Sequence, residues 1–155
     1  MGWKADRAVA PLLCALLLLL PAQARADLAL SVTGGAFVED GLNHDYSATL
    51  WHVFDQMVLL GVTSGLQIEG DDDQVPLLAS LFVRLPIGRQ LLPVATGDCG
   101  WLFGDGAGEA VWRVGGGLDL KLGDRSSLLL LGGAQMGLDD LPTRPYLRGG
   151  LILEF

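Results

Sequence analysis

The segment "NHDYS" brings together three residue types that are able to do chemistry, His44, Asp45 and Ser47. A base next to a hydroxyl is the arrangement that activates a serine nucleophile. In an extended strand adjacent side chains point to opposite faces, so Asp45 and Ser47 share a face that His44 does not. We therefore interpret His44 as a solvated loop histidine and His52 as a residue near a turn, and we expect no catalytic residue and no enzymatic activity.

A second candidate is the acidic segment "EGDDDQ", which contains four carboxylates, Glu69, Asp71, Asp72 and Asp73. Oxygen ligands of this kind suit Ca²⁺ or Mg²⁺, but the spacing does not match the EF-hand loop and its turn glycine is missing. We interpret the segment as a loop of solvated acids, with a weak divalent-cation site formed by these four residues as the alternative. The sequence predicts no cofactor and no firm metal site.

The bulk composition narrows the class of protein to which these residues belong. The chain has 155 residues, of which 50% are hydrophobic and only 18% charged, and it contains 22 glycines. This length suits one domain, and so many glycines disfavour a helical bundle. The net charge of −8, without a basic stripe, excludes nucleic acid as a partner.

Residues 1–26 predict a cleaved export signal. Lys4 and Arg7 precede the apolar run "AVAPLLCALLLLL", and Ala24 and Ala26 have the small side chains that signal peptidase reads. The apolar run is too short to cross a bilayer as a helix, which takes about 20 residues. We expect cleavage after Ala26, or after Ala24, and a mature domain of residues 27–155. Cys99 is then the single cysteine, which excludes an internal disulfide.

The sequence of residues 27–155 predicts β-strands. Segments with period-two alternation are bounded by turn-forming residues, and no segment has a helical period. The sequence predicts eight strands: 27–38, 44–54, 56–68, 74–85, 90–101, 109–122, 126–138 and 145–155.

The charges fall on one face of these strands. In "EAVWRVGGGLDLKL", the charged residues Glu109, Arg113, Asp119 and Lys121 share one parity, and the opposite parity carries Trp112, Val114, Leu118, Leu120 and Leu122. The last strand repeats the pattern, because Arg148 and Glu154 alternate with Leu147, Leu151, Leu153 and Phe155. Arg84 and Asp98 also lie opposite apolar neighbours. No Asp, Glu, Lys or Arg has to lie on the apolar face.

The composition of the two faces distinguishes a membrane barrel from a soluble sandwich. The non-apolar face is rich in Gly, Ser, Thr and Ala with a few charges of both signs, which suits the crowded interior of a narrow barrel better than a solvated surface. An apolar face that continues around all strands would expose too much apolar area in a soluble monomer. The pattern therefore predicts an all-β, eight-stranded antiparallel up-and-down transmembrane barrel.

The links between strands support the same interpretation. Longer, acidic links ("EDGLN", "EGDDDQ", "FGDGAG", "DDLPTRP") alternate with tight ones ("DQ", "PIGR", "GDRS"). Outer-membrane barrels have long extracellular loops and short periplasmic turns. An even strand number places both ends of the barrel domain on the periplasmic side. We expect Tyr46, Trp101 and Trp112 at the outer interface and Phe54 and Phe155 at the inner one.

The signal, the eight alternating strands, the glycine-rich "VGGGLDLKLGDRSSLLLLGG" and the ending "LILEF" resemble the small outer-membrane β-barrels of Gram-negative bacteria, the OmpA-, OmpX- and OmpW-like groups. The resemblance covers residues 27–155. It implies a location in the outer membrane, contact with outer-membrane lipid and lipopolysaccharide, and an assembly signal for the barrel-insertion machinery at Phe155, Leu153 and Leu151. Gly149 occupies a position that often holds an aromatic residue in that group.

Two expectations follow for the barrel. A buried unpaired charge is costly, so we expect the interior charges to pair across strands, the cations being Arg84, Arg113, Lys121 and Arg148 and the anions Asp98, Asp119, Glu109 and Glu154. The leading functional hypothesis is a monomeric, non-enzymatic outer-membrane protein that is structural or interacts through short acidic loops. The alternatives are a narrow route for small or apolar solutes and, with least support, a lipid A-modifying enzyme.

Overall fold

The computed structural model describes residues 27–39, 41–70, 72–104, 108–137 and 143–155. The predicted signal of residues 1–26 and Asp71 lie outside the described residues. Eight strands run through the described chain: β1 (Asp27–Glu39), β2 (Gly41–Asp55), β3 (Val58–Glu69), β4 (Asp72–Arg84), β5 (Leu91–Phe103), β6 (Glu109–Lys121), β7 (Ser126–Gly137) and β8 (Arg144–Glu154).

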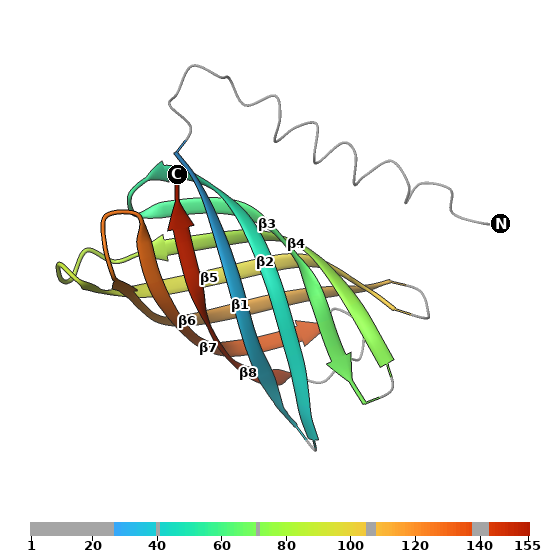
Figure 1. Ribbon diagram of the computed structural model, residues 1–155. Helices are drawn as coiled ribbons and strands as arrows, with labels where there is room; N and C mark the ends of the chain where they lie inside the picture. The colour runs from blue at the N-terminus through green and yellow to red at the C-terminus, as the bar shows by residue number, and fades with distance from the viewer. Residues whose placement is uncertain (1–26, 40, 71, 105–107, 138–142) are drawn as a thin grey trace.

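The strands close into an antiparallel barrel in which each strand pairs with its neighbours in sequence (Figure 1). The ring is completed by β1 and β8, which pair from Ala29↔Glu154 to Phe37↔Tyr146. The Phe155 amide adds a bond of 2.8 Å to the Leu28 carbonyl oxygen. The predicted eight-stranded up-and-down barrel is therefore confirmed. Among the described residues no helix is long and apolar enough to cross a membrane, a finding that concerns helices only.

The barrel has a terminal end and a distal end. The terminal end holds Asp27, Glu154 and the links 56–57, 85–90 and 122–125, whereas the distal end holds the other four links. The predicted contrast in link length is wrong. β2 already begins at Gly41 and β4 at Asp72, so the strands extend into the segments expected to be loops. Cross-strand pairs continue to Glu39↔Gly41 and Glu69↔Asp72, which leaves very short distal links there.

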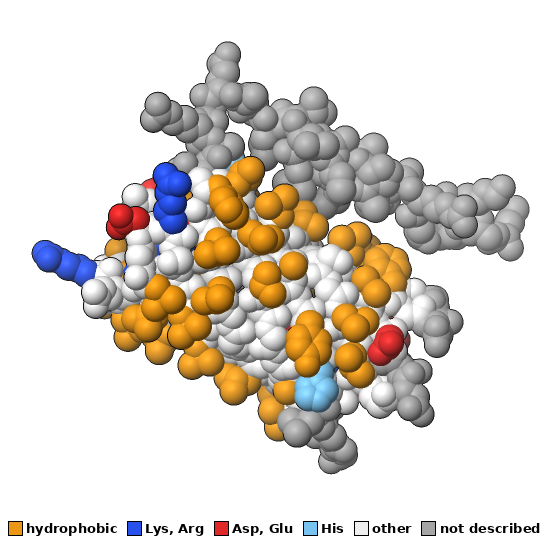
Figure 2. Space-filling model, viewed as in Figure 1, with side chains coloured by type: hydrophobic (Ala, Val, Ile, Leu, Met, Phe, Trp, Pro, Cys, Tyr) orange, Lys and Arg blue, Asp and Glu red, His pale blue; other side chains and the backbone are white. Residues whose placement is uncertain are grey.

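The outer surface is apolar on every strand. Exposed side chains include Val32 on β1, Leu50 on β2, Trp112 and Val114 on β6 and Leu151 on β8. Figure 2 shows apolar side chains spread over the visible face of the barrel, with Lys and Arg only toward the terminal end. A continuous surface of this kind is suited to lipid and not to water.

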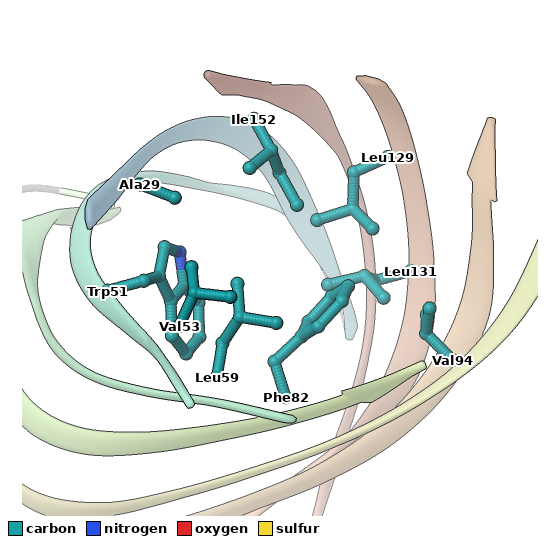
Figure 3. Packing of buried hydrophobic residues seen from close by; sticks show 9 residues of the cluster. All are labelled: Ala29, Trp51, Val53, Leu59, Phe82, Val94, Leu129, Leu131 and Ile152. Atoms are coloured by element: carbon teal, nitrogen blue, oxygen red, sulfur yellow. The ribbon is translucent and has the colours of Figure 1, made fainter. Parts of the chain in front are cut away.

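The interior contains more apolar volume than the sequence pattern indicated. Nine buried apolar residues pack against one another across the lumen: Ala29, Trp51, Val53, Leu59, Phe82, Val94, Leu129, Leu131 and Ile152 (Figure 3). They come from every strand except β6. We call this set the apolar layer. Its centre is the pair of rings Trp51 and Phe82, whose centroids lie 5.7 Å apart.

Hydroxyl groups line the wall on the distal side of the two rings. Thr63 bridges two strands, since its hydroxyl bonds Thr49 at 2.7 Å and Ser80 at 2.6 Å. The Trp51 indole donates to the Ser31 hydroxyl at 2.8 Å. These buried polar groups therefore have partners within the wall, which offsets the cost of removing them from water.

Candidate functional site

The charged residues inside the barrel form two separate clusters, one at each end. The terminal cluster consists of Arg84, Asp119, Lys121 and Glu154, which lie at or near the last residues of β4, β6 and β8. Arg84 Nε donates to Asp119 Oδ2 at 2.6 Å, and its Nη2 lies 2.7 Å from Glu154 Oε1. Lys121 Nζ donates to the same Glu154 oxygen at 3.0 Å. Two cations and two anions balance in this cluster.

The floor of this cluster is the apolar layer. The Arg84 guanidinium carbon lies 5.6 Å from the centroid of the Phe82 ring, and Arg84 Nη1 donates to the carbonyl oxygen of Gln56 at 3.2 Å. Arg84 is almost fully buried, with 1% of its surface exposed. A guanidinium in such a place needs several carboxylate and carbonyl partners at fixed positions, and the strand ends provide them.

The distal cluster is built around Asp45, whose carboxylate forms ion pairs with Arg148 and, at 4.0 Å, with Arg113. Arg113 Nε also donates to Gln135 Oε1 at 2.7 Å, and Gln67 Nε2 donates to the same oxygen at 3.2 Å. These residues come from β2, β3, β6, β7 and β8, so the network crosses the lumen. Asp45, Arg113 and Arg148 are all buried.

Two aromatic rings pack against the distal cations. The Arg148 guanidinium carbon lies 4.7 Å from the Tyr146 ring centroid, and that of Arg113 lies 5.8 Å from the Phe37 centroid. The rings contact each other edge-on, with centroids 6.1 Å apart. Cation–π contacts add stabilisation for desolvated cations that share a single carboxylate. Nearer the distal rim a separate pair joins Arg144 Nη1 to Glu69 Oε2 at 2.6 Å.

The pairing differs in part from the predicted partners. The four predicted residues of the terminal cluster do lie together. The carboxylate that pairs with Arg113 and Arg148, however, is Asp45, which was not predicted as an interior charge and was considered only within the "NHDYS" segment. Asp98 is the cross-strand neighbour of Arg113 and is half-buried. The prediction that Glu109 is an interior charge is wrong, because Glu109 is the first residue of β6 and its side chain is exposed. The parity of β2, with Asp45 on the face of Ser47 and Thr49, was the signal that could have identified Asp45.

Both histidines lie on the outer face of β2, opposite the inward Ser47 and Thr49. His44 belongs to β2 and not to a loop, and it is exposed on the outer surface with its ring stacked on Tyr46 at 6.3 Å. Asp45 and Ser47 point inward, and the Ser47 hydroxyl bonds Thr33 at 2.9 Å. His52 also lies on the outer surface, edge-on to Phe54 at 4.4 Å.

The acidic segment is also divided between faces. Glu69 is the last residue of β3 and pairs with Arg144, whereas Asp73 is exposed on the opposite, outer parity of β4. Asp72 is paired in the sheet through its backbone. Among the described residues no group of three His, Cys, Asp or Glu side chains is arranged to hold a metal ion.

The last strand presents its apolar residues outward. Leu151, Leu153 and Phe155 are exposed on the outer surface, and Ile152 and Glu154 alternate with them inside. The exposed aromatic residues Tyr46, Trp101, Trp112 and Phe54 likewise point away from the lumen.

No protein-family model and no curated protein sequence matches the chain. Solved structures do match. The chain is similar to the N-terminal β-barrel domain of Pseudomonas aeruginosa OprF, with a TM-score of 0.68, 12% identity and coverage of 84% of this chain and 98% of that one. It is also similar to Neisserial surface protein A, with a TM-score of 0.60, 10% identity and coverage of 83% and 96%.

The fold is that of the small eight-stranded outer-membrane barrels. A third similar structure of this fold is the outer membrane enzyme PagL, with a TM-score of 0.53, 14% identity and coverage of 82% of this chain and 98% of that one. The same barrel thus occurs in proteins described in different functional terms, so the fold alone does not assign an activity.

Proposed function

We propose that the protein is a non-enzymatic, monomeric barrel of the bacterial outer membrane that does not conduct solutes and meets its surroundings through its short distal links. The observation that carries the proposal is the filled lumen. The apolar layer takes side chains from seven of the eight strands, and an ion-pair cluster lies on either side of it. An eight-stranded barrel is just wide enough for its own side chains to fill it.

Ions would meet two different obstacles in such a lumen. In the terminal and distal clusters the charged side chains already pair with one another. The one side-chain polar atom of the apolar layer is the Trp51 indole nitrogen, which already donates to the Ser31 hydroxyl. Transfer of an unpaired charge into an apolar region is strongly unfavourable. The alternative of a narrow solute route has less support than a closed barrel for this reason.

Planar-bilayer recordings of the purified, folded protein test this proposal. We expect no stable unitary conductance above the noise of the bilayer at moderate voltage. Stable, reproducible steps from heat-modifiable protein would contradict the proposal and favour the narrow channel. An empty-detergent addition and a boiled sample are the matched controls.

The proposed partner of the distal end is the lipopolysaccharide surface. In the sequence, segments 39–41, 69–73, 104–109 and 138–144 contain ten acidic residues and a single Lys or Arg, Arg144; the acidic residues are Glu39, Asp40, Glu69, Asp71, Asp72, Asp73, Asp105, Glu109, Asp139 and Asp140. Carboxylates of this kind bind Ca²⁺ and Mg²⁺, ions that also bridge phosphate groups. We expect Ca²⁺ to raise the unfolding midpoint of the barrel in lipopolysaccharide-containing bilayers, and the combined D71N, D72N and D73N changes to reduce this gain.

Asp124→Asn removes a carboxylate from the terminal end and is the control for that experiment, because Ca²⁺ should raise the unfolding midpoint of this variant as much as that of the wild type. If Ca²⁺ raised the unfolding midpoint equally in the wild type and in the triple variant, the proposal that divalent cations connect the distal carboxylates to the lipid surface would be contradicted.

The proposal also includes the absence of lipid A modification. Its support is the division between outward histidines and inward hydroxyls on β2, which keeps a base away from a serine. Mass spectra of lipid A from cells with and without the protein should be identical. A change in acyl-chain number that depends on the protein would favour the enzyme alternative.

A further inference from the structure

The barrel has a recess at its terminal end, and the proposed function of a closed barrel gives this recess no role. Its volume is about 750 Å³, and it is walled by the links 56–57, 85–90 and 122–125. Arg84, Lys121 and Glu154 of the terminal cluster form its inner part. Sites for small organic molecules have volumes of roughly 300–1,000 Å³. The recess is therefore large enough for such a molecule.

Cations are concentrated in this recess. Once Lys4, Arg7 and Arg25 of the predicted signal are left aside, the ten Lys and Arg of the chain become seven. Four of these seven line the recess, namely Arg84, Arg89, Lys121 and Arg125. By contrast, only three of the 17 acidic residues in positions 27–155 (the 18 of the chain without Asp6) line it, namely Asp55, Asp124 and Glu154. A strongly acidic protein thus collects most of its positive charge at one concave place.

Two of these four cations, Arg89 and Arg125, have side chains without a charged partner in the described residues. Arg84 and Lys121 share the Glu154 carboxylate, so that carboxylate is neutralised from within the protein. The side chains of Arg89 and Arg125 are exposed, and neither guanidinium group has a hydrogen bond or ion pair within the described part of the chain. A guanidinium without a partner in a recess is suited to bidentate contact with a phosphate or a carboxylate.

The backbone holds both arginines beside the terminal cluster. The Lys121 amide donates to the carbonyl oxygen of Gln90 at 2.8 Å, which fixes the link that carries Arg89. The Glu154 amide donates to the carbonyl oxygen of Arg125 at 2.9 Å. The two links are thereby tied to the strand ends that present Lys121 and Glu154, so the free arginines flank an already ordered charge pair.

Apolar side chains complete the lining. Val53, Met57, Leu85 and Leu92 line the recess with the charged groups. A ligand with an apolar or carbon-rich body and an anionic group would be able to use both kinds of contact.

We propose that this recess binds a small organic anion whose phosphate or carboxylate group is held by Arg89 and Arg125, with Lys121 as an additional donor. The two sources of such a group are a free solute and a phospholipid headgroup. The inference concerns the terminal end alone, so it stands independently of what the distal links bind and of whether the lumen conducts.

Titration of the folded barrel tests the proposal. The protein is held in neutral-detergent micelles at constant ionic strength, and binding of inorganic phosphate and of citrate is followed by amide chemical shifts. We expect saturable shifts in the links 85–90 and 122–125 that equal concentrations of chloride do not produce. The double variant R89Q/R125Q should bind at least about tenfold more weakly, because two charge-assisted contacts are lost.

Arg144→Gln is the matched control, since it makes the same chemical change at the distal end and should leave the affinity within about twofold, as expected for a distant site. Heat-modifiable migration verifies that each variant is folded. Nanodiscs separate the two sources: if phosphatidylglycerol is the occupant, its use in place of phosphatidylcholine shifts the same amides and weakens phosphate binding. No saturable response to either anion, or equal binding by R89Q/R125Q and the wild type, would overturn the proposal.

Discussion

Asp45 is the residue on which the distal half of the lumen depends. It lies between Arg148 and Arg113 and is buried, and its removal would leave two buried guanidinium groups with one carboxylate fewer. Breaking a buried ion pair by changing one partner costs about 3–5 kcal/mol. We expect Asp45→Asn to lower the free energy of unfolding by about that amount, measured by urea titration of the barrel in lipid vesicles.

Glu109→Gln is the control for this experiment. Glu109 is exposed at the distal rim, and surface substitutions of this kind stay within about 0.5 kcal/mol. Equal effects of Asp45→Asn and Glu109→Gln would show that the interior pairs do not stabilise the barrel.

Neighbouring glycines on β7 provide a second test at the residue scale. Gly133 faces inward, and a Cβ atom there would collide with the Val114 carbonyl oxygen and lie 2.7 Å from the Tyr146 hydroxyl. At Gly132, which faces outward, the nearest atom would be 3.8 Å away, an ordinary contact. We expect Gly133→Ala to destabilise the barrel by about 1–3 kcal/mol through overpacking.

Gly132→Ala should be neutral or slightly stabilising, because it reduces the entropy of the unfolded chain where space exists. The unfolding midpoints in urea distinguish the two variants. Similar losses for both would mean that the close approach of Val114 and the Tyr146 hydroxyl to Gly133 does not require a glycine there.

At the scale of the elements, strand parity was a good guide to the faces of the barrel. The alternation in β6 and β8 predicted which side chains face outward, and the charges fixed the inner side. Parity could not predict link lengths, because polar residues such as Asp72 and Asp73 continue pairing past the end of the apolar pattern. It also did not indicate the apolar layer, since inward Trp51, Phe82 and Ile152 come from separate strands and meet only after closure.

Strand β8 provides the prediction at this scale. The Phe155 amide bonds the Leu28 carbonyl oxygen, and the Phe155 side chain remains exposed on the outer surface. Its side chain therefore contributes little to packing within the folded barrel. Deletion of Phe155 should reduce the fraction of heat-modifiable protein in the membrane more than it lowers the urea midpoint of protein that has folded. Phe54→Ala, at another exposed aromatic residue of the terminal end, should leave assembly close to wild type.

The opposite ranking would contradict the account of β8. If loss of Phe155 lowered the stability of the folded barrel strongly while assembly in cells stayed normal, the residue would be a structural anchor and not an assembly signal.

At the scale of the whole molecule, closure of the lumen depends on the apolar layer. Trp51 and Phe82 contribute its two rings, and Phe82 is fully buried. The double change W51A/F82A should open a connected path and produce conductance steps in planar bilayers. Leu81→Ala alters the outward neighbour of Phe82 on β4 and should leave the barrel silent. A silent W51A/F82A barrel would show that the ion-pair clusters close the lumen without the rings.

The central claim is a closed barrel that presents its apolar face to lipid, and gel migration in mild detergent tests it most directly. Purified residues 27–155 should migrate differently before and after boiling, because a closed barrel resists unfolding in detergent until it is heated. The protein should also need detergent or lipid to remain in solution. Identical migration of boiled and unboiled protein, with full solubility in plain buffer, would contradict it.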